Sequence, residues 1–336
     1  MKHPRVLVLS GETLFRSFFD PPRQRRLDRR FDWERVADRR ATPRLRRLLA
    51  EADALVTTWD SPCFGEELLT LAPRLRLVAH CGGEVKARFA RPLFERLVIA
   101  NAPGPMAHLV AELAVTFLLM ATRRVDAYRE ALRRPSNRVY ERLHLEGAGP
   151  ETLRGRTVGL LGFGRIGQET ARLLRPFGSR LLVHDPYVPA AAVRGTGGTP
   201  ATLARLLRES EYLVLVAGLT DATRGLLDRD ALRLLPDGAT VVNVARGGIL
   251  DLEALTAEVR SGRLRCALDV TDPLAPLPVR HPLRRMRGAI LTPHVGAAAV
   301  EVRRTMADVV LDALERFFAG KRSRTRVTPA MLDRMT

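Results

Sequence analysis

A glycine pattern in the middle of the chain constrains the fold more than any other feature. Gly162, Gly164 and Gly167 follow the apolar run 158–161, and an amphipathic stretch begins directly after them. The apolar run is typical of a buried parallel strand, and the apolar residues after the glycines recur at helical spacing until Gly178. Gly162 permits a tight turn, Gly164 lets a pyrophosphate approach, and Gly167 allows close packing of helix on strand. The order strand, glycine turn, helix therefore predicts a dinucleotide site.

Asp185 indicates which dinucleotide is bound. It ends the next predicted strand, 180–184, at the usual separation for a carboxylate that accepts hydrogen bonds from the adenosine ribose hydroxyls. A carboxylate there would repel a 2′-phosphate, and the residues that follow it, 186–188, include no arginine to receive one. We therefore expect NAD rather than NADP.

The positive charge of the chain is high but evenly spread. The formal net charge of its 336 residues is +18, and the basic residues are almost all arginines that stand among acidic residues on predicted helical faces. No known nucleic-acid motif and no alternation of aromatic and basic residues accompanies them. We expect no specific nucleic-acid partner, and only nonspecific adhesion to polyanions at low salt.

Cysteine usage and hydropathy predict the compartment. Cys63, Cys81 and Cys266 lack the paired spacing of a metal site or a disulfide framework, and an odd number of scattered cysteines fits a reducing environment. The apolar run 6–9 is too short for a signal-peptide core, and we expect no run long enough to span a membrane. The sequence thus predicts a cytoplasmic protein without a metal or a membrane partner.

Strand-like and helix-like runs alternate along most of the chain, which is the pattern of α/β folds. The first hundred residues carry such runs at 6–9, 45–50, 54–57, 64–71, 75–79 and 98–100. Later strands are predicted at 158–161, 181–184, 212–216, 240–244, 266–270 and 290–292, enough for a doubly wound sheet. Long helices are predicted at 109–122 and 300–318, and the polar stretch 125–154 is interpreted as an oligomerisation arm.

Three polar side chains stand at or just after predicted strand ends, where open parallel sheets bind their ligands. Arg246 could hold a carboxylate with two hydrogen bonds, and His294 could donate and accept a proton. Taken singly, Arg246, Asp269 and His294 also fit a surface cation, a loop cap and a hydrogen-bonded imidazole. Beside a nicotinamide, however, an arginine and a histidine match what oxidation of a 2-hydroxy acid needs.

Four segments of the chain together resemble the D-isomer-specific 2-hydroxyacid dehydrogenase family, which includes phosphoglycerate, glycerate and formate dehydrogenases. The segments are Leu153–Gly167, Asn243–Asp251, Ala267–Val270 and Thr292–Gly296, with weaker matches at Cys81–Gly83 and Val110–Glu112. The resemblance implies an α/β fold of two doubly wound domains. A Rossmann NAD-binding domain, residues 104–301, would be inserted into a flavodoxin-like catalytic domain formed by residues 1–103 and 302–336, and homodimers would form through the cofactor domain.

The resemblance also implies roles for the matched residues. Arg246 would bind the substrate carboxylate and carbonyl, His294 would exchange the proton, and the amides of Gly82 and Gly83 would meet the substrate. Hydride would pass between the nicotinamide and C2 of a 2-hydroxy or 2-keto acid. The residues implied in NAD binding are Gly162, Gly164, Arg165, Ile166, Gly167, Asp185, Val244, Ala245, Asp269 and Gly296, with Asp269 on the nicotinamide side.

The sequence departs from the family at its third catalytic residue. The family has a glutamate shortly after Asp269 that hydrogen-bonds the histidine, but Leu274 stands at that position here, and a one-residue shift reaches only Ala275. Without this carboxylate we expect a lower His294 pKa and a poorer acid for reduction at neutral pH. Asp272 could replace the glutamate or only cap its loop. Two functions stay open: a weakened NAD-dependent dehydrogenase, and a catalytically silent NAD(H)-binding sensor or scaffold.

Overall fold

The structure of the chain is a computed structural model that describes residues 3–38, 42–147, 151–272, 276–333 and 335. It divides into two compact units, and the second interrupts the sequence of the first. Unit 1 comprises Met1–Met106 with Ala298–Thr336, and unit 2 comprises Ala107–Ala297. Each unit contains a sheet of mainly parallel strands with helices on both faces, which confirms the predicted α/β fold class.

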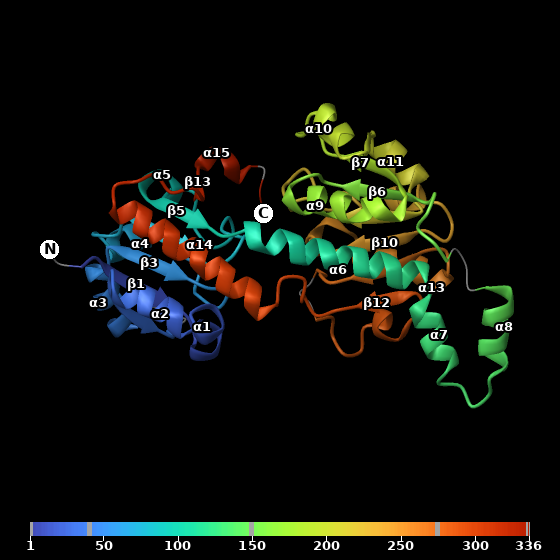
Figure 1. Cartoon of the computed structure of the whole chain (residues 1–336), viewed down its shortest axis with the longest axis horizontal. Helices are drawn as coiled ribbons and strands as arrows, with labels where there is room; N and C mark the ends of the chain where they lie inside the picture. Colours follow the sequence, from blue (N-terminus) through green and yellow to red (C-terminus); the bar gives the residue numbers. More distant parts are fainter. Residues whose placement is uncertain (1–2, 39–41, 148–150, 273–275, 334, 336) are drawn as a thin grey trace. The chain divides into compact units, whose positions relative to one another are not determined.

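The sheet of unit 1 has six strands in the order β13-β5-β4-β3-β1-β2 (Figure 1). Strands β1 to β5 run parallel, and the short β13 pairs antiparallel with β5. The order 2-1-3-4-5 is that of flavodoxin-like folds. The strands are β1 Arg5–Leu9, β2 Asp32–Val36, β3 Ala54–Thr57, β4 Leu77–His80, β5 Val98–Asn101 and β13 Arg326–Val327.

Helices bury an apolar core against each face of this sheet. One face is covered by α1 Glu12–Phe18, α2 Pro21–Asp28 and α14 Val300–Phe318. The other is covered by α3 Pro43–Glu51, α4 Glu67–Leu71, α5 Leu93–Arg96 and α15 Pro329–Leu332. Part of the arginine content has a structural use here, because Arg23 and Arg26 of α2 form ion pairs with Asp308 and Glu315 of α14.

The sheet of unit 2 has seven parallel strands in the order β12-β11-β10-β9-β6-β7-β8. Read from β8, this is the doubly wound order of dinucleotide-binding domains. The six predicted strands are present, and the seventh, β8, was missed because two residues that include a proline carry no strand pattern. The strands are β6 Thr157–Leu161, β7 Arg180–His184, β8 Thr199–Pro200, β9 Tyr212–Leu215, β10 Thr240–Asn243, β11 Arg265–Leu268 and β12 Ala289–Leu291.

Helices also cover both faces of the second sheet. On one face lie α6 Gly104–Thr122, α9 Arg165–Leu174 and α10 Ala190–Gly195, and on the other lie α11 Leu203–Glu209, α12 Arg229–Arg233 and α13 Leu252–Ser261. Short 3-10 turns occur at Arg175–Phe177, Gly247–Ile249 and Pro282–Arg285. Every β-strand of this unit therefore ends between two helical layers, and its carboxyl end opens into a loop.

Helix α6 corrects one expectation from the sequence. It begins at Gly104, before the predicted residue 109, and its 19 residues are long and apolar enough to cross a membrane by length and composition alone. The expectation that no such run exists was therefore wrong. In the structure, one face of α6 packs into the apolar core of unit 2 through Val110, Phe117 and Leu118, although only 44% of its most apolar stretch is buried.

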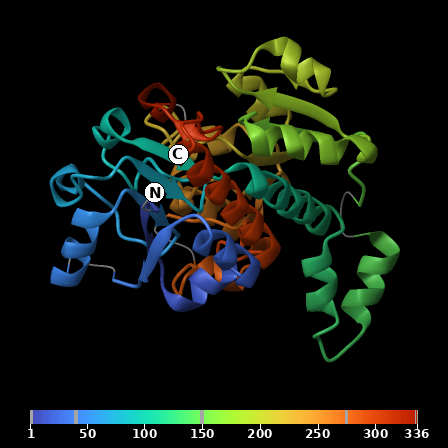
Figure 2. The ribbon, with the colours of Figure 1, turned by 60° about the vertical axis from the view of Figure 1, so that its left-hand side comes forward.

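The segment after α6 forms a helical hairpin that projects from unit 2 (Figure 2). It consists of α7 Val125–Ala131 and α8 Arg138–Glu146, and none of the residues of α8 is buried. At its base Asp126 accepts two hydrogen bonds from the Arg265 guanidinium and one from the Gly288 amide. The hairpin is thus fixed to the sheet at one end and exposed at the other.

Candidate functional site

Each of the three positions after β6 is occupied by glycine for a different structural reason. Gly162 has a φ of +100°, and a Cβ atom there would lie 2.6 Å from the Ala217 backbone. A Cβ atom at Gly167 would lie 2.7 Å from the Gly162 carbonyl oxygen. Around Gly164, in contrast, no atom of the described residues other than the glycine and its chain neighbours lies within 4 Å of a Cβ position. The fold requires the first and third glycines, whereas the second leaves open space at the start of α9, which fits a pyrophosphate.

Asp185 connects the second strand of this motif to the glycine turn. Its carboxylate accepts hydrogen bonds from the Phe163 amide at 2.7 Å and from the Tyr187 amide at 2.9 Å. The first amides of α9, those of Arg165 and Ile166, stand beyond the reach of intrahelical acceptors. A carboxylate and free helical amides therefore lie on the same turn, as binding of a dinucleotide requires.

The turn after β10 is fixed by a buried residue that sequence reasoning missed. The Asn243 side chain donates to the Arg246 carbonyl oxygen and accepts from the Ala245 amide, each at 3.0 Å. Val244 and Ala245 are buried, whereas Arg246 is half-buried at the edge of the sheet. The asparagine that opens the sequence Asn-Val-Ala-Arg-Gly-Gly, at the end of a predicted strand, was the available signal. Asn243 thus determines the backbone from which Arg246 projects.

Asp269, at the end of β11, is the centre of the hydrogen bonding at this edge. Only 2% of the residue is exposed. Its carboxylate accepts from the Thr292 hydroxyl at 2.6 Å, the Val295 amide at 2.8 Å and the Gly296 amide at 2.9 Å. Its own carbonyl oxygen accepts from the His294 amide at 2.8 Å. The Asp269 side chain therefore holds the turn that carries His294.

His294 has a backbone conformation that few side chains adopt. Its φ is +59°, in the left-handed region, where histidine is more frequent than most residues other than glycine. His294 is an exposed residue within the chain. Partial desolvation lowers the pKa of His294, the Asp269 carboxylate raises it, and the Arg246 guanidinium lowers it, with a net result below the usual value of 6.5. These three charged or titratable groups thus interact at one edge of unit 2.

Asp272 lies beside the two glycines that follow Arg246. Its carboxylate oxygen lies 3.1 Å from a Cβ position at Gly248, and an Arg224 nitrogen lies 3.3 Å from the same point. Asp272 is also absent from the charges that shift the pKa of His294. Leu274 and Ala275, where the family has its glutamate, lie outside the described residues. The carboxylate of the described residues that acts on His294 is that of Asp269.

The second predicted glycine loop belongs to unit 1 and follows β4. The Gly82 carbonyl oxygen accepts from the Ala102 amide, and the Gly83 carbonyl oxygen accepts from the Asn101 side chain at 2.7 Å. Asn101 ends β5, so the two adjacent strands fix this loop together. Both carbonyl groups are engaged within the fold, on the side of the loop that faces β5.

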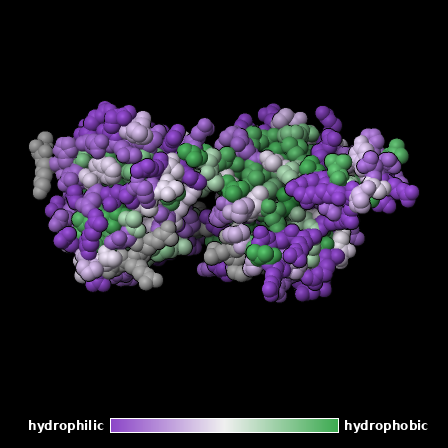
Figure 3. Space-filling model, turned by 90° about the horizontal axis from the view of Figure 1, so that it is seen from below, coloured by the Kyte–Doolittle hydropathy of each residue, from purple (hydrophilic) through white to green (hydrophobic). Residues whose placement is uncertain are grey.

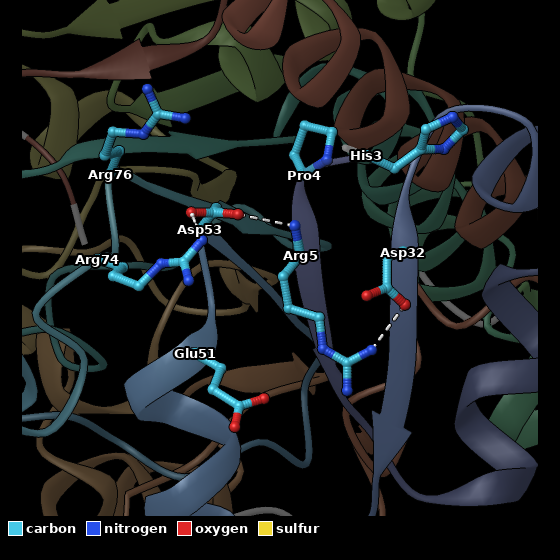
Figure 4. A pocket seen from close by; sticks show the side chains of 8 residues that line it. All are labelled: His3, Pro4, Arg5, Asp32, Glu51, Asp53, Arg74 and Arg76. Carbon is cyan, nitrogen blue, oxygen red and sulfur yellow. Dashed lines mark hydrogen bonds and ion pairs between the residues drawn. The ribbon is translucent and has the colours of Figure 1, made fainter. Parts of the chain in front are cut away.

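A charged cavity of about 720 Å³ lies at the opposite edge of the unit 1 sheet, where the strands begin (Figure 4). Arg5 pairs there with Asp32, and Arg74 pairs with Asp53. These ion pairs connect the starts of neighbouring strands, and we assign the cavity a structural role. Within the described residues no group of three or more histidine, cysteine or acidic side chains could hold a metal ion.

Comparison with known proteins places this geometry in context. Residues 115–296 match the family described as D-isomer specific 2-hydroxyacid dehydrogenase, NAD binding domain. Glyoxylate reductase of Aeropyrum pernix is 34% identical over 99% of this chain and 97% of its own length. D-3-phosphoglycerate dehydrogenase of Mycobacterium leprae is 34% identical over 81% of this chain and 50% of its own length. The chain thus spans about half the length of the phosphoglycerate dehydrogenases that it matches.

Solved structures are similar over nearly the whole chain. The 2-hydroxyacid dehydrogenase of Ketogulonicigenium vulgare has a TM-score of 0.78 and 27% identity, and the match covers 98% of this chain and 99% of that one. A protein from Thermus thermophilus has a TM-score of 0.77 and 30% identity over 96% of this chain and all of that one. The fold of both units therefore has close structural relatives.

The different environments of Gly162 and Gly164 give a direct test of the dinucleotide site. We expect Gly164→Val to leave the melting temperature unchanged and to weaken NADH binding at least tenfold, because its side chain would enter open space that the pyrophosphate needs. The matched variant Gly162→Val should instead lower the free energy of unfolding by roughly 2 kcal/mol or more, through the positive φ and the collision with Ala217. Titration of NADH fluorescence and thermal denaturation measure the two effects. Wild-type NADH affinity in Gly164→Val would contradict the assignment.

The hydrogen bonds of Asp269 predict that even a small change to its side chain lowers the stability of the protein strongly. In Asp269→Asn the amide nitrogen would face backbone N–H groups, and hydrogen bonds to a charged acceptor would be lost. We expect the free energy of unfolding in urea to fall by about 2 to 4 kcal/mol. Asp237→Asn, on a side chain that is 87% exposed, is the control and should change it by less than about 0.5 kcal/mol. Equal effects of the two substitutions would show that Asp269 does not hold the turn.

Proposed function

The chain belongs to the D-isomer specific 2-hydroxyacid dehydrogenase family, and on that premise we propose that it is an NAD-dependent oxidoreductase acting on C2 of a 2-hydroxy or 2-keto acid. One observation carries the proposal. Arg246, Asp269 and His294 interact at the carboxyl edge of the same sheet whose glycine turn leaves space for a dinucleotide. A cation, an imidazole and a dinucleotide turn on one sheet edge are the parts that this reaction needs.

The residues of unit 2 have complementary roles in the proposed reaction. Bound NADH supplies a hydride, and NAD accepts one. The Arg246 guanidinium binds the substrate carboxylate through paired hydrogen bonds and so orients C2. His294 donates a proton to the carbonyl oxygen during reduction and accepts it from the hydroxyl during oxidation. Asp269 keeps the turn of His294 in place, and Asn243 does the same for Arg246.

The cofactor site of the proposal comprises the glycine turn and the ends of four strands. Gly162, Gly164 and Gly167, with the amides of Arg165 and Ile166, hold the pyrophosphate, and Asp185 selects NAD over NADP through its charge. Val244 and Ala245 after β10, and Asp269 and Gly296 beyond β11 and β12, line the nicotinamide end. The Gly82 and Gly83 amides of unit 1 bind the substrate. Unit 2 is then the NAD-binding domain, and unit 1, with its carboxyl-terminal segment, is the substrate domain.

A second candidate function is a catalytically silent NAD(H)-binding sensor. Leu274 supports it, because the sequence lacks a glutamate where the family has its third catalytic residue. Tight NADH binding without turnover of any 2-keto acid would favour this candidate. The retained Arg246 and His294 favour the enzyme, since a sensor needs neither a carboxylate-binding cation nor a proton donor.

We also propose that the protein is a cytoplasmic homodimer that associates through unit 2. Its three cysteines are free, which fits a reducing compartment. Helix α6 is apolar but only partly buried, and the α7–α8 hairpin exposes Leu132 and Leu145 by 70% and 83%. Hydrophobic side chains also gather on the part of the surface in Figure 3 that unit 2 forms. A second copy covering this surface explains why unit 2 leaves so many apolar groups exposed.

The pH dependence of reduction tests the role assigned to His294. Because protonated His294 is the acid, kcat/KM for reduction by NADH should fall as the pH rises through its pKa, with a midpoint below 6.5. Oxidation should show the opposite trend, because it needs neutral imidazole. His294→Gln should lower kcat/KM for reduction at least a hundredfold and should abolish its pH dependence. The control is His144→Gln on exposed α8, and a reduction midpoint above 6.5 would contradict the assignment.

The dimer proposal predicts that two exposed leucines of the α7–α8 hairpin are needed for association of the two copies. Leu132→Asp and Leu145→Asp should convert the dimer to a monomer without lowering the melting temperature, since both side chains are exposed within one chain. Val279→Asp, at a position 73% exposed outside the hairpin, should leave the dimer intact. Light scattering after size-exclusion chromatography measures the mass. A wild-type monomer, or sedimentation of wild-type protein with lipid vesicles in place of dimer formation, would overturn the proposal.

A further inference from the structure

One histidine lies between two carboxylates on the surface of unit 2. His108 belongs to the first turns of α6, and its Nδ1 lies 2.6 Å from a carboxylate oxygen of Glu169 on α9. Its Nε2 lies 2.8 Å from a carboxylate oxygen of Glu112, one turn further along α6. A neutral imidazole carries a single N–H group and would turn a lone pair toward one of these carboxylates. The positions of both nitrogens therefore fit the imidazolium form, which donates on both sides.

Arg172 completes this group of side chains on α9. Its guanidinium donates to both carboxylate oxygens of Glu169, at 3.0 Å and 2.7 Å. Hydrogen bonds from Arg172 and His108 lower the pKa of Glu169 to about 2, so this residue stays ionised. We call His108, Glu112, Glu169 and Arg172 the helix clamp, because they connect α6 to α9. Two carboxylates face one guanidinium and one imidazole, so the clamp is neutral when His108 is protonated and negative when it is not.

The surroundings of His108 stabilise its protonated form. The hydrogen bond with Glu169 raises the pKa of His108 above its usual value of 6.5, partial desolvation lowers it, and the Glu112 charge raises it again. Glu112 is the only other charged residue of α6, and Arg165, which is exposed, is the only charged residue of α9 outside the clamp. The His108 side chain is 53% exposed, so solvent and salt weaken these interactions without removing them.

The helix clamp lies close to the start of α9, where the dinucleotide site begins. Glu169 comes four residues after Arg165, the first residue of α9, and so lies about 6 Å further along the helix axis. Gln168 donates to the Phe163 carbonyl oxygen at 3.1 Å and connects the same turn of α9 to the glycine turn. A charge at this distance acts on a phosphate at the helix start, since the screening length is about 10 Å in 0.1 M salt.

We infer that His108 is a positioning residue for cofactor binding, and that the helix clamp makes the affinity for NADH depend on pH. Protonated His108 holds the first turns of α6 to α9, the helix whose first amides meet the pyrophosphate. It also cancels a negative charge that would repel this anion. Both effects favour the bound dinucleotide at lower pH. The inference rests on the proposed function, in which the glycine turn and α9 bind NAD(H), and it adds a regulation of that site.

Titration of NADH fluorescence at several pH values tests the inference. The dissociation constant of the wild type should rise about two- to fourfold between a pH of about 6 and a pH of about 9 at low salt, with a midpoint above 6.5. His108→Gln, which carries no charge, should show the weaker affinity at every pH. His108→Arg, whose charge is permanent, should show the tighter affinity at every pH. His144→Gln on exposed α8 is the control and should behave like the wild type.

Two further properties distinguish this effect from other titrations of the protein. The differences between the wild type and the two His108 variants should shrink in about 0.5 M salt, because the clamp is exposed. At saturating NADH the effect does not enter kcat/KM for the keto acid, so it is separate from the titration of His294.

Reciprocity gives a second readout, which a purely structural role would not change. Because protonation of His108 favours NADH, bound NADH must raise the pKa of His108 by the matching amount. An NMR titration of the imidazole signals measures this pKa with and without NADH, and the signal that disappears in His108→Gln identifies the residue. The titration of His144 should be the same with and without the cofactor.

The outcomes separate the inference from the proposed function. NADH affinity that does not change with pH, or that changes equally in the wild type and in His108→Gln, would overturn the inference while leaving the enzyme. If NADH does not bind at any pH, the proposed function fails and the regulation fails with it, whereas the NMR titration of the protein alone still decides whether the clamp exists. A His108 pKa above 6.5 would support the clamp, and a pKa at or below 6.5 would refute it.

Discussion

The buried carboxylate of Asp269 is the interaction on which the proposed chemistry depends. It accepts three hydrogen bonds from the segment after β12, and its backbone accepts a fourth from His294. A buried charge with all its oxygens engaged is stable, whereas the same charge with one partner removed is costly. The unusual φ of His294 persists because these bonds hold the residues on both sides of it. The hydrogen bonds of Asp269 therefore hold the turn that carries the His294 imidazole against the rigid end of a strand.

The same principle operates at the neighbouring strand ends. Asn243 fixes the turn of Arg246, and Asp185 connects the end of β7 to the glycine turn. In each case a short polar side chain at or just after a strand end binds the backbone amides or carbonyls of its own loop or of a neighbouring one. Parallel strands place these ends side by side, so the loops lie next to one another in the same order as the strands. The positions of Arg246 and His294 thus follow from hydrogen bonds that do not involve a ligand.

The sequence predicted those parts of the fold whose signals are local. Apolar runs and the glycine spacing gave the two sheets, and the strand ends led to Arg246 and His294, because periodicity and turn chemistry are properties of neighbouring residues. Strand β2 was missed because Asp32–Val36 carries charged residues, and the Asn243 clamp was missed because it depends on loop geometry. The contact of His108 with Glu169 joins residues 61 positions apart in sequence on two helices, which no local pattern reports. The partial burial of α6 likewise needed the structure, since its composition alone fits a membrane span.

Reduction of a 2-keto acid by NADH, followed by determination of the configuration at C2 of the product, tests the central claim most directly. The purified protein would be incubated with NADH and with oxaloacetate or 4-methyl-2-oxopentanoate, and the products separated by chiral chromatography. Membership of the family and the positions of Arg246 and His294 predict the D-2-hydroxy acid, with formation lost in Arg246→Ala. An L-2-hydroxy acid, or saturable NADH binding without product from any 2-keto acid, would contradict the account.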